Sequence, residues 1–583
     1  MKSTARLAAL AALIVGLVAV AVAVPAQAAP SRHDVAGPWW KGAIIYEIYP
    51  RSFQDSDGDG IGDLNGITAR LDYIKSLGID AIWLTPIYPS PQVDFGYDIA
   101  DYENIDPKYG SLKDFDRLIA EARKRNIRVI MDLVLNHTSD KHPWFVESAS
   151  SKNNPKRDWY VWRDGKGPSK PPNNWQSVFG HGAWQYDAKT GQYYYHKFYI
   201  QQPDLNWRNP QVSNAMYDVE RFWIKRGVAG FRLDAVTTLY EDPQLRDEPI
   251  VRDEAGKPEI NVFGEVAVDG SLTDKQPGVH DVLRTLRRIA DGYPKDQVVL
   301  VGETWVGSVS ELRTMYGARN DELQLPMDLQ VGFIDKFDTA RFRKLINDVE
   351  TGIGGNEPLF VLDNHDKPRW DRYGDGVHNP DIGRVLSTVI IASRDTAMYY
   401  YGDEIGMVTS TPTRKEDVRD PVGVTGWPKE KGRDGERTPM QWTGAPNAGF
   451  SPPGVKTWLP IPASAAATNV AAQEGRPDSM LTWFQALGRL KHDNAALREG
   501  EQMMLNPGAP NVLSWLRKTP KGDAVVVICN FTAKPQKVSF DLKRLGIGGN
   551  HVETLLKTPG TDDPVSLSAI ALKPFGVYLL QVR

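Results

Sequence analysis

Apolar residues along the chain form short runs typical of buried strands, which alternate with segments of helical spacing. The runs predict strands at Ala43–Pro50, Ile79–Pro86, Arg128–Leu135, Gly230–Asp234, Val298–Glu303, Leu323–Leu329, Pro358–Asp366 and Thr396–Tyr401. Helical spacing marks Ile67–Leu77, Leu112–Arg125, Met216–Arg226, His280–Ile289, Arg341–Glu350, Ile382–Ala392 and Ser479–Lys491. Strands separated by helices in this way predict an α/β protein built on a parallel (β/α)8 TIM barrel.

The periodic pattern is interrupted after the third strand and ends before the carboxyl terminus. The stretch 137–206 is too long for an ordinary connection and predicts a small inserted domain, the inserted domain B. The barrel then covers 29–136 and 207–498. Residues 499–583 predict a C-terminal antiparallel β-sandwich from short strands without helices, at Val512–Arg517, Ala524–Asn530, Lys537–Phe540 and Val577–Val582.

The amino terminus has the pattern of a targeting segment. Lys2 and Arg6 form a positive flank, Leu7–Val24 is apolar, and Ala26 and Ala28 fit a small-x-small cleavage site. We predict a signal peptide over 1–28 and a secreted or periplasmic protein that leaves the membrane after cleavage; an uncleaved anchor is the alternative. Elsewhere the sequence has no stretch apolar and long enough to span a bilayer.

Composition narrows the class of partner. The 583 residues carry a formal net charge of -4, so the chain offers no basic field for nucleic acid. Its 17 Trp and 22 Tyr suit the apolar faces of sugars, although most are expected in the core. The single cysteine, Cys529, excludes an intrachain disulfide and lies in an apolar run that predicts burial.

Polar residues gather where the predicted strands end. In a parallel barrel these ends meet at one rim, where active sites lie. They carry Tyr97, Asp98, His137, Arg232, Asp234, Glu303, His365 and Asp366. Arg232 and Asp234 project to one face of their strand, and an ion pair would favour the ionised carboxylate. A structural ion pair is the alternative for these two residues alone.

Three acidic groups at one rim suggest a reaction. Close carboxyl groups cannot all ionise easily, so their pKa values separate, and one stays anionic while another keeps its proton. A proton donor beside a carboxylate nucleophile is the machinery of glycoside cleavage. The sequence shows no Cys/His metal cluster, Ser-His-Asp order or phosphate-binding glycine loop that competes with this interpretation.

An acidic loop follows the first strand. Asp55, Asp57, Asp59 and Asp63 occupy relative positions 1, 3, 5 and 9 of a calcium-loop spacing, and Ile61 would offer a backbone carbonyl at position 7. We expect a structural Ca²⁺ there, because so many carboxylates would repel one another without a cation. An acidic surface turn is the alternative. No organic cofactor is expected.

The motifs resemble those of the α-amylase family (glycoside hydrolase family 13), within it the α-glucosidase and oligo-1,6-glucosidase branch. The resemblance runs from Trp39 to the end of the chain. It rests on Asp132-Leu-Val-Leu-Asn-His137, Gln202-Pro-Asp-Leu-Asn206, Gly230-Phe-Arg-Leu-Asp234, Gly302-Glu303-Thr-Trp, Phe360-Val-Leu-Asp-Asn-His365-Asp366 and Gly432-Arg-Asp-Gly-Glu-Arg437-Thr-Pro-Met-Gln-Trp442.

The resemblance implies a role for each site residue. Asp234 would be the nucleophile and Glu303 the acid and base. Asp366 would stabilise the distorted sugar. In the substrate-binding set, Arg232 holds Asp234 ionised, His137 and His365 bind hydroxyls, Tyr97 stacks on the ring, and Asp98 with Arg437 grips the non-reducing end. The Asp55–Asp63 loop matches the calcium site of the branch.

The implied activity is that of a secreted, exo-acting, retaining α-glucosidase. Its substrate would be a disaccharide or short oligosaccharide, and its oligomeric state is open. Ala235, which follows the predicted nucleophile, favours α-1,4 linkages, because valine there is typical of the α-1,6 enzymes. The alternatives are an oligo-1,6-glucosidase, an α-glucosyl transferase or sucrose isomerase, and a non-catalytic transporter-associated ectodomain.

Overall fold

The computed structural model describes residues 37–167, 170–294, 298–548 and 551–582. The predicted signal peptide therefore lies outside the described residues. Residues 38–583 form one compact unit. No helix within the described part of the chain combines the length and the apolar character that crossing a bilayer requires.

A parallel sheet forms the centre of this unit. Its seven strands among the described residues run in the order β10-β1-β2-β3-β7-β8-β9, all paired in parallel. They are β1 (Ile44–Ile48), β2 (Ala81–Leu84), β3 (Arg128–Val134), β7 (Gly230–Asp234), β8 (Val299–Thr304), β9 (Leu325–Asp328) and β10 (Ala397–Tyr400). Nearly every strand residue is buried, as the apolar runs predict.

The predicted strand Pro358–Asp366 is not a regular strand. Only Phe360 makes a parallel bridge, to Asp328. Pro358 lacks an N–H group, but its carbonyl oxygen accepts from Thr396 N at 3.0 Å. This segment therefore joins β9 to the strand β10 and closes the predicted (β/α)8 barrel.

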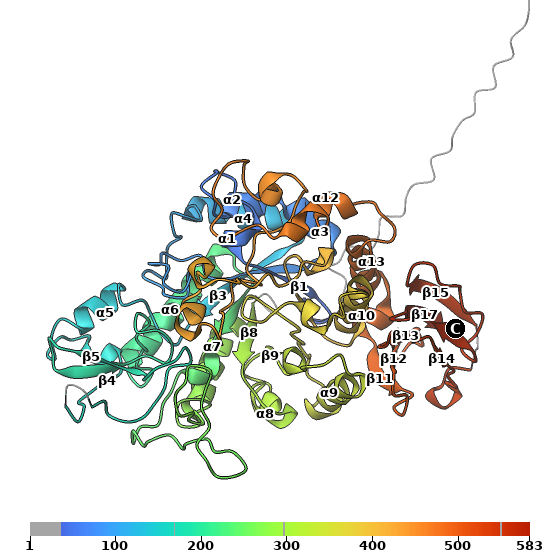
Figure 1. The fold of residues 1–583 in the computed structure, drawn as a ribbon. Helices are drawn as coiled ribbons and strands as arrows, with labels where there is room; N and C mark the ends of the chain where they lie inside the picture. Colours follow the sequence, from blue (N-terminus) through green and yellow to red (C-terminus); the bar gives the residue numbers. More distant parts are fainter. Residues whose placement is uncertain (1–36, 168–169, 295–297, 549–550, 583) are drawn as a thin grey trace, which may run out of the picture. The chain divides into compact units, whose positions relative to one another are not determined.

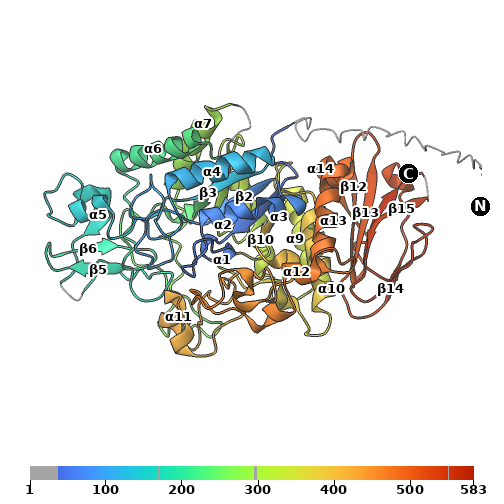
Figure 2. The same ribbon diagram turned by 90° about the horizontal axis from the view of Figure 1, so that it is seen from above.

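Helices surround the barrel strands (Figure 1), and α4 packs on β3 (Figure 2). The predicted helix Ile67–Leu77 divides at Arg70, whose backbone leaves the helical region and whose guanidinium binds Gln54. The helices are α1 (Pro50–Phe53), α2 (Leu64–Ala69), α3 (Leu71–Ser76), α4 (Leu112–Lys124), α6 (Pro210–Arg226), α7 (Gly278–Asp291), α8 (Val309–Thr314), α9 (Thr339–Gly352), α10 (Asn379–Ala392), α11 (Pro421–Gly426), α12 (Val470–Gln473), α13 (Met480–Asp493) and α14 (Ala495–Glu499).

Local sequence signals explain where the long helices begin and end. Ser111 and Asp114 form a capping box at the start of α4. Helix α6 begins earlier than its apolar spacing predicts, because Asn209 caps it and Pro210 fits the first turn. It ends at Gly227, whose φ of 104° suits glycine.

The inserted stretch contains a three-stranded antiparallel sheet in the order β4-β6-β5. Its elements are β4 (Trp162–Arg163), β5 (Trp184–Asp187), β6 (Gln192–Tyr195) and α5 (Pro143–Ser148). Trp175, Trp184 and Tyr195 belong to its own small core. Two bridges, from His137 to Asp204 and from Tyr160 to Leu205, close the base of the insertion.

The C-terminal strands form a five-stranded and a two-stranded antiparallel sheet around an apolar core, as predicted. Cys529 lies fully buried within the five-stranded sheet. The strands are β11 (Glu501–Leu505), β12 (Val512–Lys518), β13 (Ala524–Asn530), β14 (Gln536–Val538), β15 (Val552–Lys557), β16 (Ile570–Leu572) and β17 (Val577–Val582). The domain boundaries remain predictions.

Candidate active site

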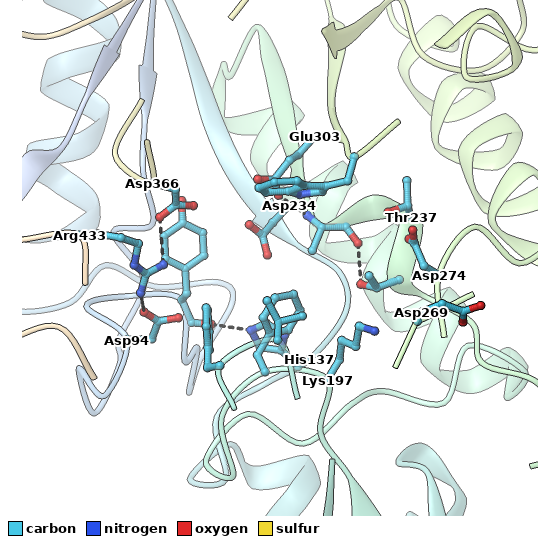
Figure 3. Close-up of a pocket in the computed structure, with 18 residues that line it drawn as sticks. Asp94, His137, Lys197, Asp234, Thr237, Asp269, Asp274, Glu303, Asp366 and Arg433 are labelled. Carbon is cyan, nitrogen blue, oxygen red and sulfur yellow. Dashed lines mark hydrogen bonds and ion pairs between the residues drawn. The ribbon is translucent and has the colours of Figure 1, made fainter. Parts of the chain in front are cut away.

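A cavity of about 400 Å³ opens at the carboxyl ends of the barrel strands. Its walls come from the strand ends, the inserted stretch and two long loops (Figure 3). The lining residues are Asp94, Tyr97, His137, Val178, Phe179, Lys197, Phe198, Asp234, Ala235, Thr237, Thr238, Asp269, Gly270, Asp274, Glu303, Trp305, Asp366 and Arg433.

Arg232, a fully buried residue of β7, joins the acidic side chains of the rim. Its Nη1 donates to Asp234 Oδ1 and to Asp132 Oδ2, the latter at 3.1 Å. Its Nη2 lies 2.9 Å from Glu303 Oε1. Asp234 and Glu303 therefore lie side by side on one guanidinium, and both line the cavity. Asp132 is the first residue of the Asp132–His137 motif, and its contact with Arg232 was not predicted from the sequence.

A tight turn after β7 fixes Glu303 relative to Asp234. Ala235 has a φ of 43°, in the left-handed region that non-glycine residues seldom adopt. In this conformation Ala235 N donates to Glu303 Oε2 at 2.8 Å. Both carboxylate oxygens of Glu303 are thereby held, one by a guanidinium and one by the backbone.

Burial raises the pKa values of Asp132, Asp234 and Glu303, and Arg232 opposes the rise at each of them. The pKa of Asp132 rises to about 6. Because one guanidinium balances one negative charge, three carboxylates around it cannot all be ionised. The ion pair that the sequence predicts is present, and Arg232 lowers the pKa of Asp234 against the effect of burial, while the coupled carboxyl groups share protons.

Asp366 behaves in the opposite way. Arg433 Nη1 and Arg437 Nη2 donate to its Oδ1 at 2.9 and 2.7 Å. Burial would raise the pKa of Asp366, but the positive charges of Arg433 and Arg437 outweigh it and hold this pKa well below its usual range. The third predicted carboxylate is therefore a fixed negative charge.

The predicted aromatic and histidine residues take different positions. Tyr97 lines the cavity and stacks on His365, with ring centroids 5.4 Å apart. His365 lies fully buried behind it, bonded to Tyr97 OH at 2.7 Å and to Glu47 Oε1 at 2.6 Å. His365 therefore does not reach the cavity surface, where direct binding of sugar would place it, and its ring contacts the Tyr97 hydroxyl instead. Burial lowers its pKa well below the usual value, so this ring is neutral.

His137 lines the cavity, as predicted. Its Nε2 lies 3.2 Å from Tyr97 O and 3.1 Å from Gln202 Nε2. Burial lowers the pKa of His137 to about 3, so the imidazole is neutral near pH 7. Gln202 is the first residue of the Gln202–Asn206 motif, and the sequence predicted no role for this residue.

The pair predicted to grip the non-reducing end is not in the cavity. Asp98 is fully buried and accepts from Ser90 Oγ and from two backbone N–H groups of its own loop. Arg437 donates to Asp366 from outside the cavity wall. Asp94 and Arg433 occupy the wall instead, joined at 2.9 Å. Asp94 and Arg433 each lie four positions before the predicted residue. Both are in irregular loops, where no periodicity indicates the direction of a side chain.

The acidic loop after β1 brings three carboxylates together. One oxygen from each of Asp55, Asp57 and Asp63 lies within 4.8 Å of the others. Asp59 lies outside this group, and its Oδ1 accepts from Ile61 N. Oxygen donors of this kind fit Ca²⁺. Asp63 also caps α2, so the loop has a structural role of its own.

Several residues that line the cavity were not predicted from the sequence. Phe179, Lys197 and Phe198 come from the inserted stretch, where periodicity is lost. Thr237, Thr238, Asp269 and Asp274 come from the long connection between β7 and α7. Two features of the sequence could have indicated them. Thr237 follows Asp234 by three residues, at the turn after the strand, and both irregular segments are unusually long.

Two adjacent buried carboxyl groups in a sugar-sized cavity, at the carboxyl end of a (β/α)8 barrel, define a glycoside hydrolase. The family model of the α-amylase catalytic domain matches residues 47–500. The chain belongs to the α-amylase family, and it is an enzyme of the α-glucosidase type within it.

Relatives of the same branch extend over most of the chain. A protein named "Probable alpha-glucosidase" of Rhizobium meliloti (strain 1021) is 41% identical over 87% of this chain and 92% of its own. The oligo-1,6-glucosidase of Parageobacillus thermoglucosidasius is 36% identical over 94% and 99%. The crystal structure of the α-glucosyl transfer enzyme XgtA, 37% identical, superposes with a TM-score of 0.84 and covers 94% of this chain and 100% of that one.

Proposed function

We propose that the protein is an exo-acting retaining α-glucosidase that releases terminal glucose from maltose and short malto-oligosaccharides. The observation that carries this proposal is the Asp94–Arg433 ion pair, which fills the cavity wall next to Asp366. We infer that this ion pair closes the cavity behind the reacting sugar ring, which suits the end of a chain better than its middle.

In the first step Asp234 attacks the anomeric carbon as Glu303 protonates the glycosidic oxygen. The bond from that carbon to Asp234 forms while the bond to the leaving sugar breaks, which gives a covalent β-glucosyl-enzyme intermediate. Arg232 holds the Asp234 carboxylate in line and spreads its charge.

In the second step Glu303 acts as a base. It takes a proton from water, whose oxygen bonds to the anomeric carbon, and Asp234 departs as a carboxylate. Two inversions leave the released glucose with the α configuration of the substrate. Asp366 stabilises the distorted ring through its hydroxyls, Tyr97 stacks on it, and Asp94 with Arg433 binds its far side.

The proposed α-1,4 preference rests on Ala235, which lines the cavity directly after Asp234. A methyl side chain leaves room that a bulkier residue would fill, and such differences discriminate by about 1–3 kcal/mol. The preference over α-1,6 linkages is therefore modest.

Replacement of Asp234 tests the reaction. Asp234→Asn keeps the size of the side chain but removes the nucleophile, so we expect loss of hydrolysis of maltose with an unchanged circular dichroism spectrum. Turnover near that of the unmodified protein would disprove the assignment. A panel of maltose, isomaltose, sucrose, trehalose and starch, with products resolved over time, tests the linkage.

A second candidate, an α-glucosyl transferase or sucrose isomerase, uses the same catalytic residues. It is favoured by relatives of similar fold, among them an isomaltulose synthase mutant from Erwinia rhapontici NX5 solved with sucrose, 34% identical with a TM-score of 0.85. Products of transfer that exceed free glucose at high substrate concentration would support this candidate.

We also propose a structural Ca²⁺ held by Asp55, Asp57 and Asp63, and export of the protein through its amino-terminal signal. The acidic loop supports the first proposal and the apolar run Leu7–Val24 supports the second. The amino terminus of the mature protein, determined by mass spectrometry, tests export.

A further inference from the structure

The long connection between β7 and α7 contains an arm, residues 249–269, that folds back on itself. Antiparallel bridges join its two halves, the last of them between Ile260 and Val266. The turn between these two residues contains Phe263, whose ring is half-buried although its neighbour Val262 is exposed. An aromatic side chain that is half-buried at the tip of an exposed turn must pack against another part of the protein.

The ring of Phe263 lies against the backbone of two other segments. A methyl group on Gly180 would lie 2.8 Å from Cγ of the ring, and one on Gly426 would lie 3.3 Å from its Cε1. Gly180 also has a φ of 92°, which favours glycine there. Gly180 belongs to the inserted stretch, and Gly426 is the last residue of α11. Phe263 therefore lies between two segments that are far apart in the sequence.

Hydrogen bonds hold the tip of the arm on the inserted stretch. His181 N donates to Glu265 Oε2 at 3.0 Å, and His181 Nδ1 lies 3.1 Å from Oε1 of the same carboxylate. Gln176 Nε2 donates to Val266 O at 2.8 Å. Because these bonds fix the arm on one of the two segments, the ring of Phe263 meets α11 from a fixed base.

Both segments reach the cavity through Arg433. Phe179, which precedes Gly180, lines the cavity, and Arg433 Cζ lies 5.1 Å from the centre of its ring. Arg433 Nε also pairs with Asp420 Oδ2 at 2.8 Å, and Asp420 caps the start of α11. The guanidinium group thus contacts one residue from each of the two segments that Phe263 separates.

The spacing between the inserted stretch and α11 determines where this guanidinium group can lie. Phe179 attracts it through the face of its ring, and Asp420 attracts it through its charge. Phe263 fills the space between the same two segments without lining the cavity itself. Loss of its ring would let the segments shift, and a displacement of about 1 Å in a group that positions the substrate can cost about a hundredfold in rate.

We propose that Phe263 is a positioning residue, which fixes Phe179 and Arg433 in the wall of the cavity from outside it. Phe263 acts through Arg433 and makes no contact with the substrate. The inference rests on the proposed function, which assigns this wall to the terminal glucose.

The first test separates binding from turnover. Phe263→Ala removes the ring, Phe263→Leu keeps part of its volume, and Val262→Ala, at a position 52% exposed in the same turn, is the matched control. For each variant, KM and kcat are measured with the disaccharide that the unmodified protein consumes fastest. We expect KM to rise at least fivefold in Phe263→Ala with kcat within twofold, because a displaced Arg433 weakens binding of the ground state and the transition state alike. Phe263→Leu should show a smaller rise in KM, and the control none.

The second test asks whether the effect passes through Arg433. Phe263→Ala is combined with Arg433→Met, and in that background it should change KM by less than twofold, because coupled residues are not additive. An equal rise in KM with and without Arg433, or an unchanged KM in Phe263→Ala alone, would overturn the positioning role. If circular dichroism shows that Phe263→Ala does not fold, the same comparison with Phe263→Leu decides. A lack of hydrolysis of every disaccharide by the unmodified protein would instead overturn the proposed function.

Discussion

Two carboxyl groups with the same guanidinium neighbour are assigned different tasks. Asp234 has one oxygen on Arg232, whereas both oxygens of Glu303 are held, by Arg232 and by Ala235 N. Asp234 thus keeps an oxygen free to attack. Burial raises the pKa values of both Asp234 and Glu303, so the pair keeps a proton at a pH where exposed carboxylic acids have lost theirs. Because Asp234 has the free oxygen, we place that proton on Glu303.

The acid role of Glu303 predicts a dependence on the leaving group. Glu303→Gln should lower kcat on maltose by about 10²–10⁴-fold, the usual contribution of a general acid. The loss on 4-nitrophenyl α-glucoside should be smaller in the first step, because that leaving group departs without a proton. Similar losses in the rate of 4-nitrophenol release and of maltose cleavage would argue against this role.

If Glu303 is the acid, it should also determine the alkaline side of the pH profile. The raised pKa of Glu303 means that kcat/KM falls as pH rises through that pKa and the acid form is lost. Asp366, with its lowered pKa, remains ionised on the acid side. We expect the alkaline fall to disappear in the residual activity of Glu303→Gln, measured over pH 4 to 9.

Arg433 gives a third prediction at this scale. It contacts Asp94, Asp366 and Asp420 at once. Arg433→Met should lower kcat/KM on maltose by about a hundredfold, since bonds to charged groups contribute roughly 1.5–3 kcal/mol each. The exposed Arg414→Met, in the same polar loop, should retain full activity. If KM and kcat were unchanged in Arg433→Met, the proposal that Arg433 binds the terminal sugar ring would be wrong.

At the level of elements, strand ends were predictable and loops were not. Arg232, Asp234 and Glu303 lie where the apolar runs of β7 and β8 end, so their convergence followed from the barrel pattern alone. Asp94 and Arg433 lie in irregular loops, where their directions depend on ion pairs between segments hundreds of residues apart. From the sequence, Asp98 was as plausible as Asp94, and Arg437 as plausible as Arg433. Only the packing of the loops shows which of them line the cavity.

The acidic loop between β1 and α2 gives a prediction for the metal. If Asp55, Asp57 and Asp63 hold Ca²⁺, chelation should lower the melting temperature, because a ligand at 100 times its Kd stabilises by about 2.7 kcal/mol. Scanning calorimetry with and without a chelator measures the shift. Asp57→Asn should reduce the increase in melting temperature caused by Ca²⁺. A melting temperature that changes neither with the chelator nor with this substitution would contradict the calcium site.

At the scale of the whole molecule, the C-terminal sheet supports the barrel from outside the active site. Arg517 of β12 is fully buried and donates to Ala392 O and Ser393 O at the end of α10, at 3.0 and 2.6 Å. These carbonyl groups have no partner within the helix. Phe337, before α9, also stacks on Phe531, just after β13, with ring centroids 4.4 Å apart.

Loss of Arg517 should therefore destabilise the barrel and the sheet together. Arg517→Met removes the hydrogen bonds to Ala392 O, Ser393 O and Gly500 O from a buried position, and we expect the free energy of unfolding to fall by about 2–5 kcal/mol. Denaturant unfolding followed by tryptophan fluorescence measures it, with the exposed Lys521→Met as control. A fall no larger than that of the control would show that the sheet is dispensable for stability.

Under the proposed exo-action, the ion pair of Asp94 and Arg433 would also dictate the order in which products depart. Glucose would lie against this barrier with the remainder of the substrate between it and solvent, so the shortened saccharide would have to diffuse away first. The enzyme would then have to discharge its monosaccharide before it could engage another chain end. Each encounter would remove a single unit, and degradation of a longer chain would proceed by repeated dissociation and recapture instead of sliding.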